Sequence, residues 1–231
     1  MNDQRPVLVI GHIENPSVEV VAKAAAEVGI PYHLARPVVG DALPPLQDVA
    51  GVIVLGGPQS AYDVDNHPYL VEEKAYIAAA YNAEVPTMAV CLGSQLAAEA
   101  LGGHALAGDN GLEVGFIDVK AVEDAGESLE GRFFSFHSDT MMPPPSAVTL
   151  AVSDRYVQAW SSGSRLAIQF HPDLDRAGIE TLLGFEGDKL ASFGVDVPAL
   201  RQELAATALS PGERLVVDWL QALRAESPSR S

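Results

Sequence analysis

Short apolar runs alternate with polar, glycine-containing segments through the first hundred residues. The apolar runs are typical of buried strands and lie at 7–10, 32–34, 51–55 and 87–90. Between them, apolar residues recur with helical spacing at 17–28, 70–81 and 94–101. Gly29 follows the first of these helices and is placed to cap its C-terminus. Strands that alternate with helices predict an α/β fold with a largely parallel sheet.

The hydrophobic pattern changes after Gly103. Further strand-like runs follow with shorter connections, at 114–119, 133–136, 148–152, 157–160 and 166–170. They predict antiparallel or mixed additions to the sheet. Helical periodicity returns from Ala177. We therefore expect one domain over residues 1–231, in which about 177–225 form a helical C-terminal completion.

Composition and charge narrow the possible partners and compartment. The chain has 231 residues, of which 48% are hydrophobic, and a formal net charge of −17. This charge disfavours nucleic acid as a partner, because the phosphates would be repelled and no Lys/Arg cluster offsets the repulsion. A single cysteine excludes an internal disulfide, fits a reducing interior and gives no metal-ligand set. The absence of a signal-peptide pattern and of a membrane-length apolar run predicts a cytoplasmic protein without membrane contact.

That cysteine, Cys91, lies where a buried strand gives way to a helix. A sharp turn there would present the thiol at the carboxyl end of the sheet, where open α/β proteins bind their ligands. Backbone N–H groups at the start of the helix favour a thiolate and a developing oxyanion. The alternative interpretation is a buried structural cysteine, which is common.

His171 ends another apolar run, and Pro172 should hold it extended at the edge of the sheet. Asp173 could accept a hydrogen bond from the imidazole and fix its tautomer, as in a nucleophile–base–acid arrangement. The alternative is a surface histidine beside an exposed acid. His137 is a competing general base, with a weaker neighbourhood for that role.

Two glycines, Gly56 and Gly57, follow the strand at 51–55. They would let backbone N–H groups approach a bound atom closely, so Gly57 is a candidate oxyanion donor opposite the N–H of Leu92. A simple turn is the alternative interpretation.

Taken together, these segments resemble the class I (triad) glutamine amidotransferases, in particular the glutaminase domain of GMP synthase and its free-standing relatives. The matching segments follow the family's order and spacing and are Gly56-Gly57-Pro58-Gln59-Ser60, Cys91-Leu92-Gly93-Ser94-Gln95, Leu101-Gly102-Gly103, Glu113-Val114-Gly115, His137-Ser138-Asp139-Thr140 and Gln169-Phe170-His171-Pro172. The resemblance implies a flavodoxin-like open sheet, mostly parallel, with antiparallel additions and helices on both faces.

The resemblance also implies an activity: hydrolysis of the glutamine side-chain amide through a γ-glutamyl thioester on Cys91, without a cofactor. His171 would act as base and acid, Asp173 would orient it, and the N–H groups of Gly57 and Leu92 would stabilise the oxyanion. The implied substrate pocket consists of Gln95, Ser138 and Asp139. In the family, the ammonia passes to a synthetase domain or to a partner protein.

The chain departs from the family pattern in two respects. The family usually has Glu where this chain has Asp173, which is one methylene shorter. No segment resembles an ammonia-using synthetase or an ATP pyrophosphatase P-loop. Two alternatives therefore stay open: a related Cys–His hydrolase of γ-glutamyl or peptide bonds, and a non-catalytic regulatory subunit with the same fold.

Overall fold

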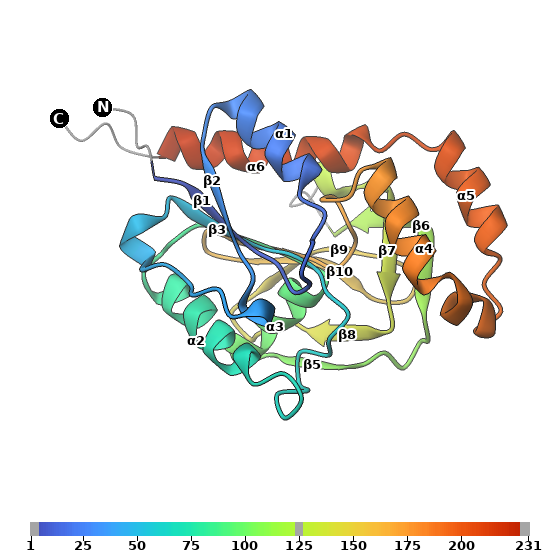
Figure 1. Cartoon of the computed structure of the whole chain (residues 1–231), viewed down its shortest axis with the longest axis horizontal. Coiled ribbons are helices and arrows are strands. Elements are labelled where there is room, and N and C mark those ends of the chain that lie inside the picture. Colours follow the sequence, from blue (N-terminus) through green and yellow to red (C-terminus); the bar gives the residue numbers. More distant parts are fainter. Residues whose placement is uncertain (1–4, 123–126, 227–231) are drawn as a thin grey trace.

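A nine-stranded sheet forms the centre of the computed structural model, which describes residues 5–122 and 127–226 (Figure 1). The strand order is β2-β1-β3-β4-β11-β10-β9-β6-β7. The strands are β1 (Val7–Ile10), β2 (Tyr32–Ala35), β3 (Gly51–Val54), β4 (Thr87–Val90), β6 (Glu113–Ala121), β7 (Gly131–His137), β9 (Val148–Val152), β10 (Val157–Ser162) and β11 (Arg165–Ile168). The predicted α/β fold with a mostly parallel sheet is confirmed.

The parallel part of the sheet consists of β2, β1, β3, β4 and β11. Its order is that of flavodoxin-like proteins, which bind ligands outside the carboxyl ends of the strands. Val90 of β4 is in register with Ile168 of β11. The segments that follow these two strands therefore leave the sheet at the same edge.

Helices cover both faces of the parallel part, and the strand residues alternate accordingly. Val7 and Val9 pack in one core with α1 (Glu19–Val28) and α6 (Ser210–Glu226), which lie side by side in Figure 1. Leu8 and Ile10 point to the other face. That second core contains residues of α2 (Tyr69–Asn82) and α3 (Leu92–Ala100).

The remaining strands form an antiparallel flank, in which β10, β9, β6 and β7 follow β11. Phe116 of β6 and Phe134 of β7 pack against α4 (Arg176–Ser192) and α5 (Val197–Ala206). The backbone N–H of His171 donates to the carbonyl of Phe134 at 2.8 Å. The far strand of the flank therefore lies against the segment that follows β11.

Several boundaries differ from the sequence expectations. The helical region after Ala177 is divided into α4, α5 and α6, and β11 ends at Ile168 rather than at Phe170. The helix after Cys91 begins at once, at Leu92. A small two-stranded sheet of β5 (His104–Ala107) and β8 (Asp139–Met142) was not expected. Short 3-10 helices lie at Pro37–Val39, Leu46–Asp48 and Glu127–Leu129.

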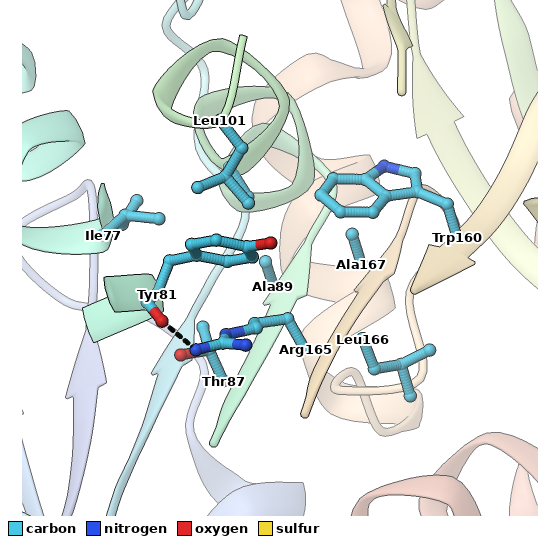
Figure 2. Close-up of a pocket in the computed structure, with 10 residues that line it drawn as sticks. Ile77, Tyr81, Thr87, Ala89, Leu101, Trp160, Arg165, Leu166 and Ala167 are labelled. Atoms are coloured by element: carbon cyan, nitrogen blue, oxygen red, sulfur yellow. Dashed lines mark hydrogen bonds between the residues drawn. The ribbon is translucent and has the colours of Figure 1, made fainter. Parts of the chain in front are cut away.

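A small cavity lies at the amino ends of β4 and β11, away from the residues that follow these strands (Figure 2). The Arg165 guanidinium lies over the Tyr81 ring, 4.1 Å from its centroid, and donates to the Tyr81 carbonyl. The cavity volume is about 10 Å³, which is room for one water molecule. It is too small for a substrate. Across the described ranges, no helix combines the length and apolar character needed to cross a membrane.

Candidate active site

Four neighbouring parallel strands end at one edge of the sheet, and chemistry-bearing residues follow each of them. His12 comes after β1, Gly56 and Gly57 after β3, Cys91 after β4 and His171 after β11. A Cβ atom at Gly56 would lie 2.9 Å from His171 Cε1 and 3.3 Å from Cys91 Cβ. The structure therefore brings the cysteine, the histidine and the glycine loop into contact.

Cys91 has a backbone conformation that side-chain-bearing residues rarely adopt, with φ 51° and ψ −112°. Such a conformation costs about 1–3 kcal/mol and persists only where the surrounding structure enforces it. Here the turn is fixed by a close approach of α3 to β3. The Gly93 N–H donates to the Leu55 carbonyl at 3.2 Å, and a Cβ at Gly93 would lie only 2.3 Å from the Val54 carbonyl oxygen. The result is the sharp strand-to-helix turn that presents a nucleophile.

His171 is paired with Asp173. The imidazole Nδ1 lies 3.0 Å from Asp173 Oδ1, and both side chains are largely buried. The shorter aspartate therefore reaches the ring. Burial alone would lower the pKa of His171, but the charges of Asp173 and of the Cys91 thiolate, with their hydrogen bonds, outweigh it and raise the pKa to about 10. This environment favours an imidazolium at His171.

The two predicted oxyanion donors lie next to each other. A Cβ at Gly57 would lie 2.9 Å from Leu92 Cδ2. Leu92 is the first residue of α3, so its N–H has no acceptor within the helix. Among residues 5–122 and 127–226, the N–H of Gly57 has no hydrogen-bond acceptor either. Both groups are therefore available to an oxyanion.

The predicted substrate-pocket residues are only partly brought together. The Gln95 amide donates to the Asp139 carbonyl at 3.0 Å, and Ser60 Oγ donates to Asp139 Oδ2 at 2.5 Å. Cys91 Sγ lies 3.8 Å from the carbonyl oxygen of Phe136, so the turn between β7 and β8 is close to the thiol. Ser138 lies in this turn with an exposed side chain.

His137, the competing base, belongs to a separate buried network. Its Nε2 lies 3.0 Å from Glu113 Oε2 and its Nδ1 lies 2.8 Å from the Asp139 carbonyl. Glu113 also accepts hydrogen bonds from Ser153 and Gln158. Burial alone would raise the pKa of Glu113, but these hydrogen bonds, that of His137 first, lower it. With both ring nitrogens occupied, His137 is poorly placed to take a proton from Cys91.

Sequence reasoning missed one pair behind the glycine loop. His12 Nε2 lies 2.9 Å from Glu73 Oε1, and both side chains are fully buried. His12 Nδ1 lies 3.2 Å from the Gly56 carbonyl oxygen. The only local signal was a histidine just past a buried strand, and its partner lies far along the chain in the second turn of α2.

Comparison with known proteins agrees with this geometry. A family model described as "Glutamine amidotransferase class-I" matches residues 15–179. The chain belongs to this family.

Three known proteins resemble this chain, each over a different share of its own length. A glutamine amidotransferase from Thermotoga maritima, known from a crystal structure, has a TM-score of 0.83 at 26% identity, with 97% of this chain and 99% of that chain covered. A protein named GMP synthase [glutamine-hydrolyzing] from Tropheryma whipplei is 30% identical over 189 residues, which are 78% of this chain and 36% of that protein. A protein from Natronomonas pharaonis, named as one subunit of a glutamine-hydrolysing GMP synthase, is 28% identical over 71% of this chain and 86% of its own length. The amidotransferase chain thus spans about a third of the Tropheryma protein and most of the Natronomonas one.

Proposed function

We propose that this class-I amidotransferase hydrolyses the side-chain amide of glutamine to glutamate and ammonia, with Cys91 as nucleophile. The observation that carries the proposal is the contact between a strained Cys91 and the buried His171–Asp173 pair, at the carboxyl ends of adjacent parallel strands. A nucleophile, a base and a group that orients the base are the parts that acyl transfer needs.

In the first half of the reaction, the Cys91 thiolate attacks the amide carbon and the carbonyl oxygen becomes an oxyanion. The N–H groups of Gly57 and Leu92 stabilise this charge. The carbon–nitrogen bond then breaks, and the His171 imidazolium gives its proton to the departing nitrogen. Ammonia leaves, and a γ-glutamyl thioester remains on Cys91.

In the second half, His171 is neutral and takes a proton from water, which attacks the thioester carbon. The tetrahedral intermediate collapses, glutamate leaves and the thiolate–imidazolium pair is restored. Asp173 stabilises the imidazolium in both halves through its bond to Nδ1, which leaves Nε2 for proton transfer. Its short side chain still reaches the ring, and this supports an active rather than a silent site.

The pocket for the glutamine backbone is assigned to Gln95, Ser138 and Asp139. The hydrogen bonds of Gln95 and Ser60 to Asp139 hold this segment near Cys91. The free amino and carboxylate groups of glutamine would be recognised there, and this favours free glutamine over a glutamine residue within a peptide chain. The ammonia acceptor is proposed to be a synthetase subunit or domain, as the name of the Natronomonas relative suggests.

The deciding experiment measures glutamate release from saturating glutamine by the wild-type chain and by Cys91→Ala. We expect release by the wild type and none by the variant. A parallel assay with γ-glutamyl peptides distinguishes the related hydrolase, which would turn these over faster than glutamine.

If the wild type releases no glutamate, labelling with 6-diazo-5-oxo-L-norleucine separates the remaining explanations. Modification of Cys91 without turnover indicates a competent site that requires a partner. Absence of modification in the wild type and in Asp173→Glu alike would contradict the proposal and favour a non-catalytic subunit.

A further inference from the structure

The peptide unit between Gly56 and Gly57 connects the oxyanion donor to a buried ion pair. Its N–H belongs to Gly57 and its carbonyl to Gly56, whose oxygen lies 3.2 Å from His12 Nδ1. In a trans peptide, the N–H and the carbonyl point in opposite directions. Among the described residues there is no cis peptide. A group that fixes the carbonyl therefore also fixes the direction of the N–H.

His12 has an acceptor at each ring nitrogen. Nε2 lies 2.9 Å from the Glu73 carboxylate, and Nδ1 faces the Gly56 carbonyl. A carbonyl can only accept a hydrogen bond, so Nδ1 is the donor to Gly56, and Nε2 donates as well where the Glu73 carboxylate accepts. Burial alone would lower the pKa of His12, but the charge and hydrogen bond of Glu73, followed by the carbonyls of Gly56 and Leu55, raise it above its ordinary value. The contacts and the raised pKa of His12 both favour a ring that is protonated on its two nitrogens.

The surrounding contacts hold this arrangement tightly. The Gln59 amide donates to the His12 carbonyl at 2.9 Å, which ties the loop after β3 to the end of β1. A Cβ at Gly57 would lie 2.5 Å from His12 Cβ, so only glycine fits there. Both members of the pair are 0% exposed. The loop has little freedom to rotate the peptide.

Stability alone does not account for a buried pair of this kind. Burying two charges is so costly that apolar residues of similar size are often equally stabilising. By contrast, a charged donor on the Gly56 carbonyl polarises the whole amide and makes its N–H a stronger donor. An N–H donor of this kind acts on the oxyanion that forms only as the reaction proceeds.

We propose that His12, held in place by Glu73, is a positioning residue that orients and polarises the Gly56–Gly57 peptide toward the oxyanion. This inference rests on the proposed glutaminase activity. It assigns the pair no contact with the substrate, and it predicts an effect on the transition state rather than on glutamine binding.

The test replaces the pair by apolar residues, His12→Leu with Glu73→Met, so that no unpaired charge is left buried. We expect kcat for glutamine hydrolysis to fall about 30- to 100-fold, because a disordered oxyanion donor loses much of its effect. KM for glutamine and the rate of Cys91 alkylation by iodoacetamide should stay within about twofold, since neither depends on the oxyanion. Inhibition by glutamate γ-semialdehyde, whose thiohemiacetal places an oxygen in the same position, should weaken by a factor similar to the fall in kcat.

Tyr76→Phe is the matched control on α2. It removes the 2.9 Å hydrogen bond from Tyr76 to the Pro44 carbonyl and does not touch His12 or the loop. It should leave kcat and the aldehyde affinity unchanged. Glu73→Gln, which keeps the shape and removes the charge, should lower kcat by about three- to tenfold with KM unchanged.

The outcomes separate the two proposals. A wild type without glutaminase activity would overturn the proposed function and this inference with it. An active wild type with an equally fast double variant would overturn the inference alone. So would a loss of kcat that is accompanied by an equal loss of alkylation rate, because that result indicates general disruption. If the double variant fails to fold, an unchanged kcat in Glu73→Gln overturns the inference.

Discussion

Replacing Asp173 by asparagine tests the electrostatics of the site most directly. The variant keeps the size of the side chain and removes its charge, which is the first of the groups that hold the proton on His171. We expect the pKa of His171 to fall from about 10, and the basic limb of the pH profile of kcat/KM to move to lower pH with it. At pH 8, kcat should fall by up to about tenfold, because the imidazolium that gives a proton to the departing nitrogen is depleted.

The size of the shift follows from the geometry. Nδ1 and Oδ1 are 3.0 Å apart, so the centres of the two charges lie slightly farther from each other. Opposite charges about 4 Å apart attract by about 4 kcal/mol at an effective dielectric constant near 20. One pKa unit corresponds to about 1.4 kcal/mol, so the attraction is equivalent to about three units. Three units is the upper bound, because the asparagine can still accept a hydrogen bond from Nδ1.

The assay is a titration of histidine ring signals by NMR in protein labelled with ¹³C-histidine. The chain has six histidines, and the signal of His171 is identified by its absence in His171→Gln. Asp175→Asn is the control, because it makes the same change two positions away, where the carboxylate caps α4 through the Gly178 N–H. The reasoning is refuted if His171 titrates near pH 6.5 in the wild type, or if Asp173→Asn leaves its pKa in place.

Three further predictions concern the fold around the nucleophile. Cys91→Gly should be more stable to urea than Cys91→Ala by about 1 kcal/mol, because glycine relieves the strain at φ 51°; equal midpoints would contradict this. Gly93→Ala should lower the unfolding free energy by about 2 kcal/mol or more, because its Cβ would lie 2.3 Å from the Val54 carbonyl oxygen. Its control is Gly184→Ala in α4, where a Cβ would have no neighbour within 4 Å, and this variant should be neutral or stabilising. Finally, the raised pKa of His171 should stabilise the fold fully below about pH 6.5, and this contribution should be lost as the pH rises toward 10. Urea titrations of the wild type and of His171→Gln across this range should converge at high pH.

The sequence predicted the parallel part of the fold because its signals are local. The strands β1 and β4 match their expected limits, and Gly29 caps α1 with φ 71°, as expected. Buried apolar runs bounded by glycine carry this information without reference to distant residues. Cys91 and His171 were identifiable for the same reason, since each follows such a run.

What the sequence could not reveal depends on contacts between distant segments. The strands β5 and β8 consist of short stretches with no clear alternation, and only their pairing across about thirty intervening residues makes them strands. His12 carries no motif, and its partner Glu73 lies inside a helix, where a glutamate normally faces solvent. The sequence pattern did not separate α4 from α5, because Asp196 caps the start of α5 only a few residues after α4 ends.

The contact between strand β7 and the segment after β11 has a consequence for self-association. An edge strand offers unpaired backbone groups to other chains and is a common site of aggregation. At β7 the carbonyl of Phe134 is already engaged by the N–H of His171, and the ring of Phe133 stacks on that of Phe170 at 4.2 Å. At the opposite edge, β2 is only four residues long. The contact that supports the backbone of His171 thus also shields a sheet edge, so a variant that loosens it is expected to aggregate as well as to lose the proposed activity.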